Sequence, residues 1–369
     1  MKTVRRLLYR DIAASVMFVA LAFLSLFFFI DFVDELDGVG KRGRTSWHAL
    51  LAAGLELPGH FYELFPIAVL IGTIYSLARM AQSSEYTILR TGGLGPGRAL
   101  ALLTWLGLGF ALITFVVGDV VAPASEREAV VLKARFSGGL KFDGSGAWLK
   151  EKRSTGDGEH SYSVNVAGAS SGGALAGIRI FEFDSDGRLV ARTEAREGKV
   201  ADDGTWHLSD AEVTRWPRAR SAEAQVQVQR LATLSWPSTL SASVVAAAVL
   251  PLATMTTLEL WRYAMHLSDQ EQAAQQYSIR FWRKALYPLA CLVMMALALP
   301  FAYMHARSGS VSFRVFGGIM LGIGFVLLNN LSGHIGMLRG WTPWVAAATP
   351  SLGFLLLSMG AFAWLVRYR

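Results

Sequence analysis

The positions at which this chain could do chemistry are few and scattered. The seven histidines include no pair four residues apart beside a glutamate, so a zinc site of the helical type is not expected. The only cysteine, Cys291, lies inside an apolar run, which excludes a disulfide or a multi-thiolate metal site within one chain. The one Gly-x-Ser-x-Gly match, Gly168-Ala-Ser-Ser-Gly172, lies among short alternating runs and not between a strand and a helix, so nothing points to hydrolase chemistry. We expect no catalytic residue, no metal and no cofactor in this chain.

A glycine-rich run does not change this expectation. Gly93-Leu-Gly-Pro-Gly97 lacks the Lys-Ser/Thr pair that follows the glycines of a phosphate-binding loop. Pro96 also removes one backbone N–H donor from the run. The pattern is typical of a turn, so any nucleotide must be bound by another chain.

The stretch just before this turn, from Ala81 onward, is too polar to lie in lipid and separates two long apolar segments. It predicts a short helix from Ser84 to Arg90, with the hydroxyl of Ser83 or Ser84 accepting a bond from a free N–H of the first turn. Glu85 at the start and Arg90 at the end both complement the helix dipole. Because so short a helix is not stable alone, it must be held by membrane helices or by a partner.

The composition is that of an integral membrane protein. Of the 369 residues 53% are hydrophobic and only 17% are charged, whereas soluble domains carry about a quarter charged residues. The formal net charge of +7 comes from residues that flank the apolar segments, since residues 121–280 are almost neutral. This is the positive-inside bias of membrane proteins, and a nucleic-acid surface is not indicated.

Six apolar segments are long enough to cross a bilayer, which takes about 20 residues each. The charge bias places both termini and the loop between the second and third spans in the cytoplasm. A seventh apolar run, 243–258, is short and contains Pro251, and counting it as a span would place the basic C-terminus outside. Residues 47–59 predict an amphipathic interfacial helix before the second span. The predicted spans are 12–33, 61–80, 100–120, 282–303, 313–332 and 343–366.

A different composition occupies the middle of the chain. From residue 123 to 238, short alternating apolar runs are separated by turn sequences such as Asp184-Ser-Asp-Gly187, which predicts an all-β domain of sandwich or jelly-roll type. Because three spans precede it, we expect this domain on the outer side of the membrane. The predicted organisation is three spans in 1–122 with the short helix at about 82–92, a periplasmic β domain in 123–238, a connector in 239–280 and three spans in 281–369.

Polar and small residues inside the spans admit two interpretations each. The three acids Asp31, Glu63 and Asp119 lie near span ends, where solvation explains them better than a function. Asn329 and Asn330 either bond between helices or line a polar cavity. Gly318 and Gly322 allow close helix approach, which suits internal packing or a seam with a second subunit. No acid lies mid-span, which argues against a proton-coupled carrier.

Several motifs together resemble one known family, the LptF/LptG permeases of lipopolysaccharide export. Their residues are more similar to those of the LptG members. The resemblance covers the chain end to end. The motifs are Phe32-Val-Asp-Glu-Leu36, Tyr62-Glu-Leu-Phe-Pro-Ile67, Leu70-Ile-Gly-Thr-Ile-Tyr75, Ala81-Gln-Ser-Ser-Glu-Tyr-Thr-Ile-Leu-Arg90, Trp282-Arg-Lys284 and Tyr287-Pro-Leu289.

The resemblance implies a non-catalytic subunit of an ATP-driven exporter in the inner membrane of a Gram-negative bacterium. It implies pairing with LptF, two copies of the ATPase LptB that hold ATP and Mg²⁺, and the partner LptC. Lipopolysaccharide would enter a cavity between the two permeases and pass to the periplasmic β domains.

The same resemblance implies roles for particular residues. The loop helix becomes the coupling helix that docks on LptB, with Glu85 pairing with an arginine of the ATPase and Tyr86, Ile88, Leu89 and Arg90 completing the contact. The first and fifth spans would line the substrate cavity. Phenylalanines of the first span offer a surface for acyl chains or simply face lipid. The cavity candidates are Phe18, Phe23, Phe27, Phe28, Asp31, Lys41, Arg42, Asn329 and Asn330.

One position departs from the family pattern. Some relatives carry a phosphate-contacting lysine near the outer end of the first span, where this chain has Asp31. An acid does not favour phosphate contact, so we expect Lys41, Arg42 or Arg44 to substitute. Rival interpretations are the sister permease LptF, a membrane anchor for a β domain, and a membrane-embedded lipid enzyme.

Overall fold

The computed structural model describes most of the chain. The described residues are 2–137, 140–141, 147–155, 158–169, 174–201, 204–217, 225–238, 254–269, 275–303 and 311–367. They form two compact units, one made of residues 1–37, 53–125 and 275–369 and the other of residues 38–52 and 126–274. Each unit is described by itself. The apolar run 243–258, which the sequence excludes from the spans, lies largely outside the described residues.

The six predicted spans are confirmed as helices long and apolar enough to cross a membrane. The third span continues from α4 through a π-helical turn, η2, into α5, and the fourth passes from α8 through η4 into α9. The helices of the six spans and of the loop between the second and third spans are α1 (Lys2–Leu36), α2 (Ser46–Gln82), α3 (Glu85–Thr91), α4 (Pro96–Val116), η2 (Val117–Val121), α5 (Ala122–Ser137), α8 (Gln275–Leu286), η4 (Tyr287–Leu289), α9 (Ala290–Ala302), α10 (Val311–Leu338) and α11 (Pro343–Arg367).

Helix α2 is the centre of the bundle, because α1, α4, α9 and α10 all pack on it. Phe65 meets Phe110 of α4 edge to face at 5.6 Å between ring centroids. The Thr73 hydroxyl donates to the sulfur of Met295 on α9. A Cβ at Gly72 would lie 2.6 Å from the backbone of Val16, so α1 crosses α2 in backbone contact.

The small residues of α10 serve this internal packing. A Cβ at Gly318 would lie 2.7 Å from Ile74, and one at Gly322 would lie 2.7 Å from Ile67. Both isoleucines belong to α2. Of the two interpretations of this glycine pair, the structure therefore supports close approach within the chain.

The expected break before the second span is wrong. Residues 47–59 were predicted as a separate interfacial helix, but α2 is continuous and contains Pro58 and Pro66. Each proline removes one helical N–H bond. Packing against neighbouring helices compensates for this in membrane helices, and most of α2 after Pro66 is buried.

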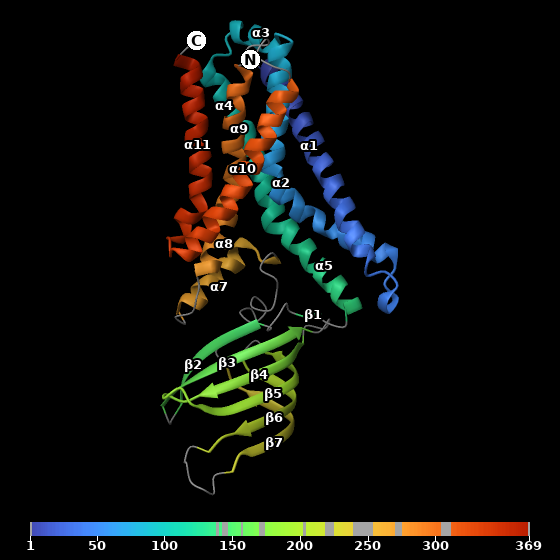
Figure 1. Ribbon diagram of the computed structural model, residues 1–369, viewed down its shortest axis with the longest axis vertical. Coiled ribbons are helices and arrows are strands. Elements are labelled where there is room, and N and C mark those ends of the chain that lie inside the picture. Colours follow the sequence, from blue (N-terminus) through green and yellow to red (C-terminus); the bar gives the residue numbers. More distant parts are fainter. Residues whose placement is uncertain are drawn as a thin grey trace. The chain divides into compact units, whose positions relative to one another are not determined.

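Within its described residues, the second unit contains one antiparallel sheet, inserted after the third span as predicted. Its strands follow one another across the sheet as a meander from β2 to β7, with β1 beside β3 (Figure 1). The strands are β1 (Leu140–Lys141), β2 (Ala147–Thr155), β3 (Gly158–Ala169), β4 (Leu175–Phe183), β5 (Leu189–Val200), β6 (Trp206–Arg215) and β7 (Gln227–Trp236).

Local chemistry explains where these strands turn and which face they bury. At the β4–β5 turn, Oδ1 of Asp184 accepts bonds from the backbone N–H groups of Asp186 and Arg188, and Gly187 has a positive φ of 75°. Alternating residues supply the core, including Val164, Ile178, Ile180, Trp206 and Leu208.

The predicted polar connector is helical where the structure describes it, in α7 (Thr257–Asp269) and then in α8. The start of α7 is a capping box. The backbone N–H of Thr256 donates to Oε2 of Glu259 at 2.8 Å, and the N–H of Glu259 donates to the Thr256 hydroxyl at 3.2 Å. Arg127 of α5 forms an ion pair with the same carboxylate and donates to the Thr254 carbonyl. These contacts hold α7 to α5 within the second unit.

Candidate functional site

The strongest candidate site is α3, the short helix between the second and third spans. It lies at the end of the bundle where α1 begins and α11 ends (Figure 1). Its seven residues confirm the helix that the sequence predicts. A helix of this length needs outside support, and the contacts of its side chains show where that support comes from.

The bundle itself holds α3. Tyr86 is only 4% exposed, and its ring packs edge to face against Tyr303 at the end of α9, with ring centroids 5.4 Å apart. Tyr303 in turn contacts Phe362 of α11 at 6.2 Å. Leu94, just after α3, is 3% exposed in the same core, and Leu89 packs against it. Aromatic and aliphatic burial therefore attaches α3 firmly to α9 and α11.

This burial changes the part that Tyr86 can play. The prediction that its ring is an anchor for a partner does not agree with a ring buried in this chain's own core. Burial also raises the pKa of Tyr86 well above its ordinary value, so the side chain is a neutral phenol. Tyr86 positions α3 from the inside.

The outward side of α3 consists of other residues. Glu85 and Arg90 are exposed, and the side chain of Ile88 is 68% exposed. The Arg90 guanidinium lies 5.9 Å from the centre of the Tyr303 ring, in cation–π contact. The helix thus exposes the acid Glu85 and the apolar Ile88, while the exposed Arg90 lies at the edge of this surface against Tyr303.

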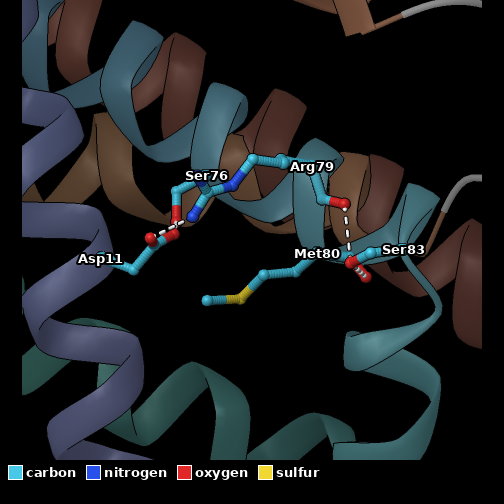
Figure 2. Close-up of polar contacts among 5 residues, drawn as sticks. All are labelled: Asp11, Ser76, Arg79, Met80 and Ser83. Carbon is cyan, nitrogen blue, oxygen red and sulfur yellow. Dashed lines mark hydrogen bonds and ion pairs between the residues drawn. The ribbon is translucent and has the colours of Figure 1, made fainter.

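The predicted serine cap is wrong. Ser84 precedes α3 in a left-handed conformation, with φ 62°, and its side chain makes no capping bond. The Ser83 hydroxyl turns back to donate to the carbonyls of Arg79 and Met80 at the end of α2 (Figure 2). The two serines therefore close α2 and turn the chain into α3.

A polar cluster fixes α1 to α2 close to this turn. Asp11 of α1 accepts a bond from the Ser76 hydroxyl at 2.5 Å and pairs with the Arg79 guanidinium (Figure 2). Ser76 and Asp11 are at least partly buried, so their bonds are shielded from water. The helix that leads into α3 is therefore tied to the first span as well as to the bundle core.

A second polar group lies near the other end of α1. Nε2 of His60 lies 2.7 Å from Oδ2 of Asp31. Glu56, one turn before His60 on α2, brings its carboxylate to the same place, and the three ligand atoms lie within 4.8 Å of one another. Local sequence patterns do not reveal this group, because Asp31 is 29 residues from His60.

Comparison with known proteins identifies the chain. A family profile described as "Lipopolysaccharide export system permease LptF/LptG" matches residues 6–367. The chain belongs to the LptF/LptG family. Among similar proteins, the "Lipopolysaccharide export system permease protein LptG" of Escherichia coli K12 is 26% identical over 357 residues, and that of Haemophilus influenzae is 24% identical over 362 residues. Each alignment covers 96% of both chains.

Family membership establishes the general role. The chain is a multi-pass membrane permease of the lipopolysaccharide export system, an ABC-type transporter subunit without a catalytic domain of its own. The interpretation as a membrane-embedded lipid enzyme is thereby set aside. Sequence similarity favours the LptG members over LptF.

The predicted cavity residues of this LptF/LptG permease are in different surroundings. The side chain of Phe18 is 75% exposed on α1, whereas Phe23 packs partly against the core. The Phe27 ring lies against the His60 ring, with centroids 4.9 Å apart. Phe18 therefore faces outward, while Phe23 and Phe27 are partly engaged in packing.

The polar candidates are also dispersed. Oδ1 of Asn330 on α10 accepts a bond from Arg283 of α8 at 2.9 Å, which confirms the interhelical use of this asparagine. Asn329 beside it is half-buried. Lys41 and Arg42 belong to η1 (Lys41–Gly43) in the second unit, where Lys41 is exposed. Asp31 is engaged with His60 within the first unit.

Proposed function

We propose that this permease is the LptG-type half of the exporter and that α3 is its coupling helix. The observation that carries this proposal is the two-sided character of α3. Tyr86 ties the helix to its own bundle, while Glu85 and Ile88 point away from it. A segment built in this way transmits a displacement at its outer side to α9 and α11 as a rigid body.

The partner contact combines charge with apolar burial. An exposed ion pair made by Glu85 contributes only about 0.2–1 kcal/mol. Ile88 therefore supplies much of the contact energy, because its largely exposed side chain is available for burial against a partner. Leu89 is half-buried and supports the helix from within, and Arg90 borders the outer side.

The remaining partners follow from membership of the export system. In this proposal the chain pairs with an LptF permease, rests on two LptB subunits that bind ATP and Mg²⁺, and works with LptC. The termini and α3 are cytoplasmic, and the β domain is periplasmic. Helices α1 and α10 expose apolar side chains such as Phe18 and Leu327, which suits contact with the second permease and with acyl chains.

The decisive experiment changes the charge on α3. The complex is reconstituted with LptF and LptB, and binding of LptB, ATPase activity and lipopolysaccharide release are measured for Glu85→Gln and Glu85→Asp. Loss of an exposed ion pair weakens binding by up to about fivefold, and transport falls with it, whereas the aspartate variant retains part of the activity.

The matched control is Asp34→Asn, which removes an exposed acid near the opposite end of α1. It should leave both LptB binding and ATPase activity unchanged. Equal transport by the wild-type and Glu85→Gln complexes would remove α3 from the proposed coupling role. Purification of the chain without any ATPase would favour the anchor interpretation instead.

A further inference from the structure

Asp31, Glu56 and His60 have the geometry of a metal-ligand group. They come from two different helices, α1 and α2, and each offers a ligand atom within 4.8 Å of the other two. All three are half-buried, so they are shielded from bulk water without being sealed from it. Two carboxylate oxygens and an imidazole nitrogen are ligands that zinc and related divalent ions take in proteins.

The helical framework sets these positions. Glu56 and His60 are four residues apart on α2 and share one face of it. Asp31 comes from α1, and Phe27, one turn before it, packs its ring against His60. The imidazole is therefore oriented by an aromatic contact on one side and by the Asp31 carboxylate on the other.

A histidine–aspartate pair alone accounts for only part of this arrangement. The 2.7 Å contact joins Asp31 to His60. This contact needs only one carboxylate, but the carboxylate of Glu56 also lies within 4.8 Å of both groups. Two carboxylates this close repel each other when both are ionised, and a cation between them relieves that repulsion.

We propose that Asp31, Glu56 and His60 bind one divalent metal ion of the zinc class, which clips α1 to α2. Metal–ligand bonds of about 2.0–2.2 Å at tetrahedral angles set the ligand atoms farther apart than the 2.7 Å contact between Asp31 and His60, so the ion replaces the proton shared in that contact and the two side chains open around it. Three protein ligands leave a further position open to water or to an anionic ligand. This site is independent of the proposed coupling role of α3, which lies at the opposite end of α1.

The test measures metal binding directly. The full-length chain is purified in detergent, freed of any affinity tag and stripped with a chelator. It is then titrated with Co²⁺, followed by visible absorption, and with Zn²⁺, followed by calorimetry. We expect one equivalent of metal per chain, and at least about tenfold weaker binding in each of Asp31→Asn, Glu56→Gln and His60→Gln.

Two controls make the result decisive. Glu63→Gln removes an exposed acid from the same helix and His48→Gln removes another histidine, and both should bind metal like the wild type. A triple variant that combines Asp31→Asn, Glu56→Gln and His60→Gln should not bind the metal at this site. Unchanged metal binding by this triple variant, or no metal binding by the wild type, would overturn the proposal. If the triple variant does not fold, Glu56→Gln decides, because Glu56 takes no part in the 2.7 Å contact; a zinc-induced rise in the unfolding temperature must then be smaller in that variant than in the wild type.

Discussion

At the scale of single residues, Tyr86 matters most, because it converts a short polar loop into an element fixed to the bundle. We expect Tyr86→Ala to destabilise the packing of α3 against the bundle by about 3 kcal/mol, since it removes a buried ring and leaves a cavity beside Tyr303. Thermal unfolding in detergent and protease cleavage within residues 81–95 measure this effect.

Tyr86→Phe is the matched control, because it keeps the ring and its edge-to-face contact. It should behave nearly as the wild type in both measurements. An alanine variant as resistant to protease as the wild type would show that α3 is held by other contacts.

At the scale of elements, the crossing of α1 over α2 depends on the absence of a side chain at Gly72. A Cβ there would lie 2.6 Å from the backbone of Val16, and backbone cannot rotate out of the way. We expect Gly72→Ala to cost about 1–3 kcal/mol and to lower the unfolding temperature in detergent.

The control for this prediction lies on α10. A Cβ at Gly317 would meet nothing within 4 Å, so Gly317→Ala should be neutral or slightly stabilising through helix propensity. Equal unfolding temperatures for the two alanine variants would contradict the close crossing.

The start of α7, in the second unit, is stabilised by an amount that depends on pH. Burial alone raises the pKa of Glu259, but bonds from Thr256 and the charge of Arg127 outweigh it and hold the pKa below its ordinary value of 4.5. The contribution of Glu259 is therefore fully present above pH 4.5 and is lost as the pH falls through the lower folded-state pKa.

Hydrogen exchange of the α7 amides checks this prediction. In the wild type, protection corrected for intrinsic exchange rates should be constant from about pH 7 down to pH 4.5 and should fall as the pH is lowered further. Glu259→Gln should lose about 1 kcal/mol of local protection near neutral pH and show less change with pH. A variant that follows the wild-type pH profile would exclude the carboxylate as the cause.

At the scale of the whole molecule, the proposed topology places α3 and the β4–β5 turn on opposite sides of the membrane. The native Cys291 is fully buried, so single engineered cysteines report their own positions. We expect Ile88→Cys to react with a membrane-impermeant thiol reagent only after the inner membrane is opened. Asp186→Cys, in an exposed turn, should react before that. The reverse pattern would place the coupling helix outside and end the proposed role of α3.

The sequence alone determined the elements of this protein. Six spans, an inserted β domain and a short loop helix follow from hydropathy, turn residues and charge, which are local properties of the chain. The strand turn at Asp184–Gly187 was predictable for the same reason, because its bonds join residues within four positions. The motifs between Asp31 and Gly93, together with those at residues 282–284 and 287–289, also indicated the family.

Only the tertiary structure decided which faces of these elements meet. It buried Tyr86 against Tyr303, set Gly318 against Ile74, and brought Asp31, Glu56 and His60 together from two helices. The rotation of each helix about its axis and the crossing of its neighbours decide these contacts. Both depend on packing between distant segments, so residues far apart in the chain acquire a shared role that their spacing does not show.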